Sequence, residues 1–249
     1  MTTKAKIKKF QLALGSLDDG IAGASTWDSA LRFLEYEGYT TLRMPYSDTQ
    51  FGCKVVITKP HQVRLYDTEG AYGVNAFSYS MSGTFTIMQG DGKRKPISIM
   101  INEGHVLRGS ACHAYTTMGN FPEGILYYTN GGKLGTTTAR FASELKDLDI
   151  RWAIGGLTML PKFNAEAEGF TGVFSDVFRY TSHNAIGFDK YGNIIGVYHR
   201  KCTLKTFQKK CRSIGLVEAI SVDGGSISAI NAGSLKANIY LRQGSIIGF

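Results

Sequence analysis

The sequence predicts an α+β domain with a mixed or largely antiparallel β-sheet and few helices, plus a small helical hairpin at the N-terminus. Thirty glycines supply many turns. Runs of β-branched and aromatic residues are short and numerous, and helical periodicity is confined to a few segments. With 249 residues, 43% apolar and 19% charged, the chain can bury one large core. We therefore expect a helical segment at 1–40 and one main domain at 41–249.

Residues 1–40 contain two apolar helix faces separated by a glycine loop. Ile7, Phe10 and Leu14 recur at helical spacing, and a second helix with Trp27 follows a Ser or Thr cap. The segment, with its loop Asp19-Gly20-Ile21-Ala22-Gly23, resembles a peptidoglycan-binding repeat. The resemblance implies attachment to a cell wall. The alternative is a helical hairpin that only covers a sheet edge or an apolar face of the main domain.

The first half of the main domain is rich in predicted strands. The runs at 54–58, 84–88 and 97–101 are dominated by β-branched and apolar residues. One helix is expected near 139–148. These runs indicate a strand-rich chain with many turns.

The second half alternates strands with one amphipathic helix. An apolar segment at 153–160 precedes a hairpin at 184–197, whose turn is marked by Asp189 to Asn193. Leu204, Phe207, Cys211 and Ile214 then recur at helical spacing, with Thr203 as the N-cap and Gly215 as the stop. The chain continues into a buried strand at 217–222.

Asp223 is the strongest candidate for an active-site residue. It follows the strand at 217–222 directly, and Gly224 and Gly225 let the backbone approach a ligand closely. Ser226 adds a hydroxyl and a main-chain N–H suited to an anionic or sugar group. An acid at the carboxyl end of a strand lies where open sheets commonly bind ligands. Asp-Gly-Gly is also ordinary tight-turn chemistry, and that alternative stays open.

The order of these segments resembles the phosphodiester glycosidase family over residues 70–235. The family shows an Ile-Gly-Gly block, an Arg-Thr-Ala-Ile-Gly block before a strand pair, a helix, and then Leu-Asp-Gly-Gly-Gly-Ser. This chain has Ile154-Gly155-Gly156, then Ala185-Ile186-Gly187, and then Val222 to Ser226. It departs from the family at three places: His183-Asn184 replace Arg-Thr, and Ser226 replaces the third glycine.

The resemblance implies cleavage between an anomeric carbon and a phosphodiester oxygen through an oxocarbenium-like state. Asp223 would be the nucleophile or an electrostatic stabiliser, and Asp176 or Glu144 the partner acid or base. His183 would supply positive charge to the phosphate leaving group if it is protonated. The substrate would be contacted by the remaining candidates, which are Asn75, Gly155, Gly156, Asn184, Gly224, Gly225 and Ser226. Alternatively, His183 bonds within a loop, Asp176 caps a turn, and Gly155-Gly156 form a bend.

The charge balance favours an anionic partner. The formal net charge is +8 and the isoelectric point is near 9.2, which suits teichoic acid, nucleic acid or sugar phosphates. Helix-turn-helix, zinc-finger and RNP motifs are absent from the sequence, so nucleic acid is not favoured. The chain has neither an apolar run of the roughly 20 residues that span a bilayer nor a secretory h-region. We expect cytoplasmic synthesis, followed by release through lysis or within a virion, by analogy with phage proteins.

The four cysteines predict no structural metal site; the sequence indicates no cofactor and leaves a divalent cation open. Cys53, Cys112, Cys202 and Cys211 form no C-x-x-C pair and have no histidine at zinc-finger spacing. We expect them to be free buried thiols in a reducing compartment. Cys112 and His113 are the nearest Cys–His pair, but adjacent residues on a strand would face opposite ways.

Two functions of different classes follow from the sequence. The first is a glycosidase that releases a sugar from a phosphodiester-linked substrate, with a cell-wall glycopolymer as a candidate. The second is a non-catalytic protein of phage type that binds a cell wall or a sugar phosphate, in which the departures at His183 and Ser226 mark lost catalysis.

Overall fold

We describe a computed structural model of the chain over residues 3–13, 21, 30, 45–116, 119–163 and 165–249. The chain divides into two compact units, residues 1–44 and 45–249. In the first unit, α1 (Thr3–Ala13) forms at the predicted first helix, and the Gln11 side chain donates to the backbone of Ile21 at 2.9 Å. The predicted loop and second helix of the repeat lie almost entirely outside the described residues.

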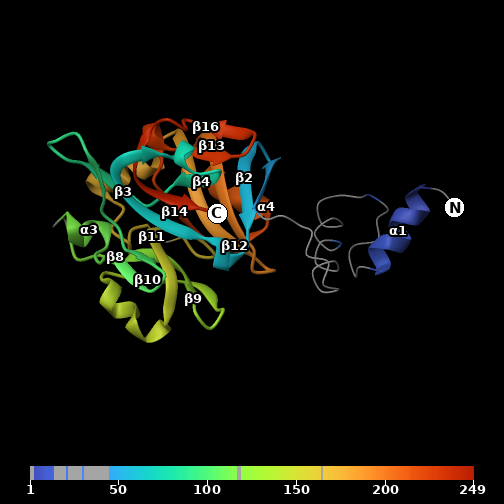
Figure 1. Cartoon of the computed structure of the whole chain (residues 1–249), viewed down its shortest axis with the longest axis horizontal. Helices are drawn as coiled ribbons and strands as arrows, with labels where there is room; N and C mark the ends of the chain where they lie inside the picture. Colours follow the sequence, from blue (N-terminus) through green and yellow to red (C-terminus); the bar gives the residue numbers. More distant parts are fainter. Residues whose placement is uncertain (1–2, 14–20, 22–29, 31–44, 117–118, 164) are drawn as a thin grey trace. The chain divides into compact units, whose positions relative to one another are not determined.

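The second unit is built on antiparallel sheets (Figure 1), which confirms the predicted fold class. The largest sheet has ten strands in the order β1-β2-β13-β12-β14-β11-β7-β8, with β9 paired to β11 and β10 paired to β9. Its strands are β1 (Tyr46–Gln50), β2 (Cys53–Thr58), β7 (Met100–Asn102), β8 (His105–Arg108), β9 (Glu123–Thr129), β10 (Leu134–Ala139), β11 (Ile150–Leu160), β12 (Thr181–Asp189), β13 (Ile194–Cys202) and β14 (Leu216–Val222).

A second sheet of five strands has the order β16-β15-β4-β17-β3, and a separate hairpin pairs β5 with β6. The bounds are β3 (Arg64–Gly73), β4 (Tyr79–Ser82), β5 (Thr86–Met88), β6 (Arg94–Pro96), β15 (Ile230–Ala232), β16 (Leu235–Ala237) and β17 (Arg242–Gly248). The helical elements of this unit are α3 (Cys112–Tyr115), α4 (Leu204–Ile214) and the 3₁₀ turns η1 (Pro60–Gln62), η2 (Val74–Ala76), η3 (Ala142–Leu148), η4 (Gly172–Phe178) and η5 (Gly225–Ile227).

The main core lies between the two large sheets. Fully buried side chains from the ten-stranded sheet, such as Ile154 and Ile186, belong to one cluster with Met81 and Ile247 of the five-stranded sheet. A smaller cluster, including Ile99 and Leu145, packs between the ten-stranded sheet and η3. The inner faces of the two sheets therefore share one core.

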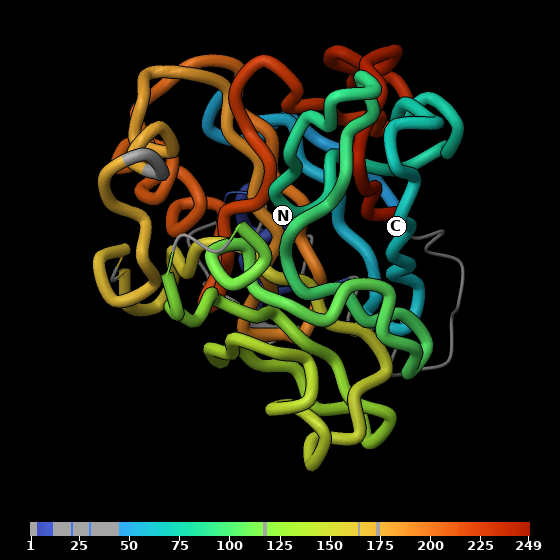
Figure 2. Tube along the Cα trace, turned by 90° about the vertical axis from the view of Figure 1, so that its left-hand side faces the viewer, coloured from blue at the N-terminus to red at the C-terminus, as the bar shows by residue number. Residues whose placement is uncertain are grey.

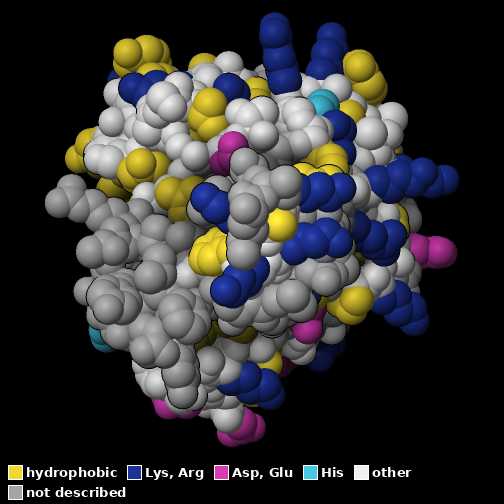
Figure 3. All heavy atoms as spheres, turned by 90° about the vertical axis from the view of Figure 1, so that its right-hand side faces the viewer, with side chains coloured by type: hydrophobic (Ala, Val, Ile, Leu, Met, Phe, Trp, Pro, Cys, Tyr) yellow, Lys and Arg dark blue, Asp and Glu magenta, His cyan; other side chains and the backbone are white. Residues whose placement is uncertain are grey.

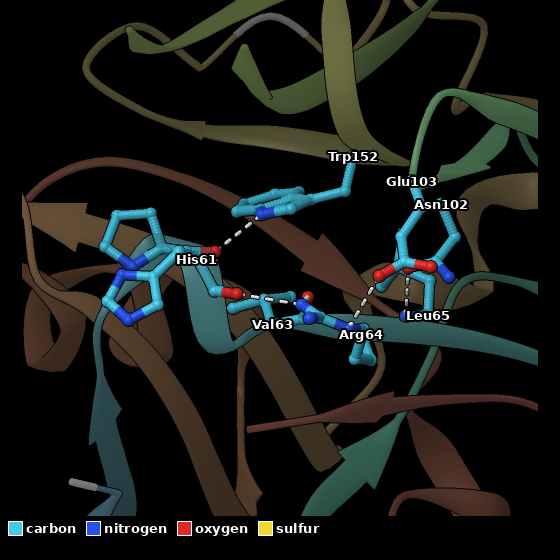
Figure 4. A network of polar contacts seen from close by, with 8 residues as sticks. His61, Val63, Arg64, Leu65, Asn102, Glu103 and Trp152 are labelled. Carbon is cyan, nitrogen blue, oxygen red and sulfur yellow. Dashed lines mark hydrogen bonds and ion pairs between the residues drawn. The ribbon is translucent and has the colours of Figure 1, made fainter. Parts of the chain in front are cut away.

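A polar network joins the two sheets at one edge of the core (Figure 4). The Trp152 indole N–H donates to the Pro60 carbonyl at 2.8 Å, so this buried aromatic has its polar atom satisfied. The Asn102 side chain accepts from the Leu65 backbone at 3.0 Å, and Arg64 pairs with Glu103 at 3.2 Å. These contacts join β3 to β7 and its following turn, and η1 to β11.

The local predictions in the second half of the chain are confirmed closely. The hairpin is β12 and β13, and α4 begins after Thr203, whose hydroxyl accepts from the Thr206 backbone at 3.3 Å. Gly215 ends α4 with a positive φ of 106°.

Two local predictions were wrong. The helix expected near 139–148 is a 3₁₀ segment that begins at Ala142, because β10 continues to Ala139. Cys112 and His113 lie in the short helix α3 instead of on a strand.

Among the described residues, no helix is long and apolar enough to cross a membrane. The four cysteines are buried free thiols, as predicted.

Candidate active site

A cavity of about 270 Å³ opens at the end of β14. One part of its wall is apolar and includes Phe85, Ile97 and Phe170, with the two phenylalanine rings 5.4 Å apart. Another part of the wall is charged and consists of Asp176, Arg179 and Asp223. The cavity therefore combines an apolar surface with a charged one, as binding sites for small polar molecules commonly do.

Asp223 is held at the cavity by three hydrogen bonds from different parts of the chain. Its carboxylate Oδ2 accepts from the Thr86 hydroxyl at 2.6 Å, and its backbone N–H donates to the Gly83 carbonyl at 2.9 Å. Its own carbonyl accepts from the Asn184 amide at 3.0 Å. Figure 2 shows the chain near Gly83 beside the chain near Asp223. The carboxylate is thus bonded from the hairpin side, and the backbone of Asp223 is held from the β12 side.

Burial raises the pKa of Asp223 from 3.8 to about 7. The Thr86 hydrogen bond, the charge of Arg94 and the Gly224 N–H act in the opposite direction, while the charge of Asp176 raises the pKa further. Only 9% of the residue surface is exposed. A carboxyl group of this kind changes its protonation state near neutral pH, which is typical of groups used in acid–base or electrostatic catalysis.

The glycines after Asp223 make a tight turn as well as part of the cavity wall. Gly225 has a φ of +68°, a conformation that favours glycine. A Cβ on Gly224 would lie 3.0 Å from the Ser182 carbonyl. Both glycines line the cavity. The turn and the site are therefore the same feature, whereas Ser226 is exposed and lies outside the cavity wall.

Asp176 lies in the same cavity and forms an ion pair. Its Oδ2 is 2.9 Å from the Arg179 Nη2, and its carbonyl accepts from the Arg179 Nε at 3.1 Å. Of the two candidate partner acids, Asp176 therefore lines the same cavity as Asp223 and His183.

His183 lines the cavity but is 3% exposed. Its Nε2 lies 3.0 Å from the Cys202 carbonyl, and its ring stacks on Phe207 with centroids 5.4 Å apart. Burial lowers the pKa of His183, against hydrogen bonds to the backbones of Cys202 and Arg179 that raise it. We therefore expect a neutral ring at pH 7, which does not favour the charged, phosphate-binding role that the family resemblance suggests.

Asn184 is fully buried behind Asp223. Its amide nitrogen binds the Asp223 carbonyl, and its Oδ1 has no hydrogen-bond partner in the part of the chain that the structure describes. This placement favours a role in positioning Asp223 over the predicted contact with a sugar hydroxyl.

Gly155 and Gly156 are packing glycines in the middle of β11. A Cβ on Gly155 would lie 2.0 Å from the Glu123 carboxylate, and one on Gly156 would lie 2.3 Å from the Ser221 carbonyl. Neither lines the cavity. They allow β11 to lie against buried neighbours, so their contact with a substrate, suggested by the family resemblance, is not favoured by this geometry.

Two other predicted residues lie outside the cavity wall. Glu144, in η3, accepts from the Arg140 backbone at 3.1 Å and pairs with its Nε at 3.3 Å. Asn75 is exposed in η2, and its backbone N–H donates to the Ile239 carbonyl at 3.1 Å. The structure does not bring either residue to Asp223, because each belongs to an element bonded elsewhere.

The structure adds site residues that the sequence analysis did not include. Thr86 binds the Asp223 carboxylate, and Arg179 supplies a cation to the cavity. Cys112 also lines it, with its Sγ 3.1 Å from the His113 Nδ1. Burial raises the pKa of Cys112 strongly, so it is a thiol and a poor nucleophile.

Glu123 is a second buried acid, close to the cavity wall at Cys112. Its carboxylate accepts from the backbone N–H groups of Ile99 at 2.7 Å and Cys112 at 3.1 Å. Burial raises its pKa to about 8 despite these bonds. No sequence motif marks Glu123, because its significance depends on three segments that meet only in the fold.

Among the described residues, no group of three or more His, Cys, Asp or Glu side chains has the arrangement of a metal site. The acids of the cavity are Asp176, paired with Arg179, and Asp223, bonded to Thr86.

The fold and the cavity define an antiparallel two-sheet protein with a buried carboxyl group in a polar cleft. A sequence profile for phosphodiester glycosidases matches residues 74–244, which is more than half of the chain. The chain belongs to the phosphodiester glycosidase family, as the order of its motifs predicted.

Solved structures show the same fold. The catalytic domain of zebrafish N-acetylglucosamine-1-phosphodiester alpha-N-acetylglucosaminidase, auto-inhibited by its pro-peptide, has a TM-score of 0.56 and 12% identity, covering 83% of this chain and 81% of that chain. A putative exported protein from Burkholderia pseudomallei has a TM-score of 0.56 and 11% identity, covering 90% of this chain and 80% of that chain. No curated protein matches the sequence.

Proposed function

We propose that the protein hydrolyses glycosyl phosphodiesters, releasing a free sugar and a phosphate monoester. Membership of the phosphodiester glycosidase family supports this class of reaction. The observation that carries the proposal is the position of Asp223: a buried carboxyl group at the end of β14, bonded to Thr86 and facing a cavity that also holds Asp176 and Arg179.

The proposed reaction breaks the bond between the anomeric carbon and the phosphodiester oxygen. The bonding electrons leave with the phosphate group, and a water oxygen ends on the anomeric carbon. The Asp223 carboxylate faces the positive charge that develops there, as a nucleophile or as an electrostatic stabiliser. A phosphate leaving group needs little protonation, because its monoester is a stable anion. The proton released from water goes to solvent or to that anion.

The leaving group instead needs positive charge or N–H donors near its oxygens. The Gly224-Gly225 turn and Arg179 line the same cavity as Asp223. This combination of an anionic carboxylate for the sugar and donors for the phosphate suits a glycosyl phosphodiester better than an uncharged glycoside.

We extend the proposal to wall glycopolymers whose sugars are linked through phosphate. The support is the net charge of +8 and the predominance of Lys and Arg over Asp and Glu on the face drawn in Figure 3. Exposed basic side chains on α4 include Lys205, Lys209 and Arg212. Such a surface attracts polyanions over distances comparable to the Debye length. The peptidoglycan-binding repeat expected at residues 1–40 remains part of this proposal.

The test is incubation with a sugar 1-phosphodiester, followed by assay of reducing sugar and of phosphate monoester. The proposal predicts equal amounts of both products from the wild type and neither from Asp223→Asn. If no product forms at any pH, the proposed hydrolysis is wrong.

One observation favours the second candidate function, a non-catalytic binding protein. The neutral, buried His183 stands where the family resemblance has an arginine. Saturable binding of the phosphodiester without turnover would establish this alternative.

If sugar is released, its anomeric configuration distinguishes the two proposed roles of Asp223. Retention of configuration indicates that Asp223 is a nucleophile.

A further inference from the structure

Arg179 is a cationic side chain in the wall of the Asp223 cavity. Among the described residues that line the Asp223 cavity, it is the only Lys or Arg. It follows η4 directly and precedes β12, which carries His183 and Asn184. Arg94 also acts on Asp223 electrostatically, but it is not part of the cavity wall.

The backbone at Arg179 is fixed, whereas its side chain is largely exposed. The Arg179 N–H donates to the Asp176 carbonyl at 3.1 Å, and the buried His183 ring bonds to the Arg179 backbone while stacking on Phe207. The side chain itself is 67% exposed. His183, which stands where the family has an arginine, therefore supports the backbone segment that carries Arg179.

The contact that Arg179 makes with Asp176 is one that an anion can replace. The guanidinium uses Nη2 and Nε on the Asp176 carboxylate and carbonyl. An ion pair as exposed as this one contributes little to stability. Two oxygens of a phosphate group can accept in parallel from the same guanidinium N–H groups. Such a bidentate arginine–phosphate contact is stronger than a neutral hydrogen bond.

We propose that Arg179 binds the phosphate group of the substrate, exchanging the Asp176 carboxylate for phosphate oxygens. The inference rests on the proposed function for its substrate class, and it assigns the phosphate subsite to the η4–β12 junction. Asp176 then acts as a competitor that occupies Arg179 in the free protein. Removing its charge should strengthen phosphate binding, and removing the guanidinium should weaken it.

The experiment measures calorimetric binding of N-acetylglucosamine 1-phosphate to full-length variants that all carry Asp223→Asn, which prevents turnover. The set is Arg179→Gln, Arg179→Lys, Asp176→Asn and the matched control Arg140→Gln. Arg140 pairs with Glu144 in another surface ion pair, which lies outside the cavity wall. Thermal unfolding of each variant confirms that it is folded.

We expect Arg179→Gln to weaken binding about tenfold, and Asp176→Asn to strengthen it about threefold. Arg179→Lys should fall between the parent and Arg179→Gln, because lysine keeps the charge but not the fork. Arg140→Gln should bind like the parent. Equal affinity of Arg179→Gln and the parent would overturn the inference, as would weaker binding by Asp176→Asn or no measurable binding by the parent.

Hydrolysis assays on the same substitutions with Asp223 intact separate the two proposals. Turnover by the wild type together with unchanged affinity in Arg179→Gln contradicts the inference and leaves the proposed function standing. Binding that depends on Arg179 without turnover by the wild type supports the inference and contradicts hydrolysis.

Discussion

The Thr86 hydroxyl donates a 2.6 Å hydrogen bond to the Asp223 carboxylate across 137 residues of sequence. It connects the β5–β6 hairpin to the end of β14, and it stabilises the ionised form of the acid. A partly buried carboxylate that receives a hydroxyl donor holds a lower pKa than one without it.

Thr86→Val should therefore raise the pKa of Asp223 further above 7. If ionised Asp223 is the active form, the rising limb of the pH–rate profile moves to higher pH, while Thr86→Ser keeps the profile of the wild type. The measurement is kcat/KM for a glycosyl phosphodiester across neutral pH. An unchanged midpoint in Thr86→Val would show that this hydrogen bond does not control the titration.

If the proposed hydrolysis is correct, the activity of the wild-type protein should rise with pH through about 7. This direction follows because the pKa of Asp223 is about 7 and the proposed role requires its carboxylate. A rate that falls over the same range would instead assign Asp223 as a proton donor.

Asp223→Asn should stabilise the fold at high pH while abolishing turnover. The pKa of Asp223 is raised on folding, so its contribution to stability is present below pH 3.8 and is lost as pH rises through about 7. The amide removes a buried charge and can still accept from Thr86. We expect the variant to be more stable than the wild type by roughly 2 kcal/mol in urea unfolding above pH 7, with no such gain in acid. If Asp223→Asn and the wild type were equally stable at every pH, the burial of an ionised carboxylate would be contradicted.

Gly156→Ala should destabilise the protein by about 3 kcal/mol, because the added methyl group would meet the Ser221 carbonyl at 2.3 Å and push β11 from β14. Gly90→Ala is the matched control, since nothing lies within 4 Å of its Cβ. Urea midpoints of the two variants provide the comparison. If Gly156→Ala unfolds like Gly90→Ala but loses affinity for sugar, the substrate-binding role expected from the family motif would regain support.

His183→Phe should lower the free energy of unfolding by about 1–3 kcal/mol, because it removes a buried hydrogen bond to the Cys202 carbonyl while keeping the contact with Phe207. The pH–rate profile should be unchanged at pH 7 and above, because burial lowers the pKa of His183 and its ring is already neutral there. Loss of an ionisation with unchanged stability would restore the charged role suggested by the family resemblance.

The second half of the chain was predictable because its signals are local. The turn at Asp189 to Asn193, the Thr203 cap and the Gly215 stop each define an element through neighbouring residues. The position of Asp223 was predictable for the same reason, because a strand followed by Asp-Gly-Gly places its acid at the end of that strand.

The partners of Asp223 were not predictable in this way. Thr86 lies in a short strand with no motif, and it reaches the acid only because Gly83 bonds to the Asp223 backbone. Arg179 directly follows η4, a 3₁₀ segment that carries no strong sequence pattern. Glu144 was selected by residue type alone, and the structure gives its carboxylate to Arg140.

The most direct test of the account is the stoichiometry of products released from a glycosyl phosphodiester by the wild type and by Asp223→Asn. The account predicts one free sugar for each phosphate monoester with the wild type, and substrate binding without products with the variant. Products formed equally well by Asp223→Asn would contradict it, because the buried carboxyl group at the end of β14 would then have no part in the reaction.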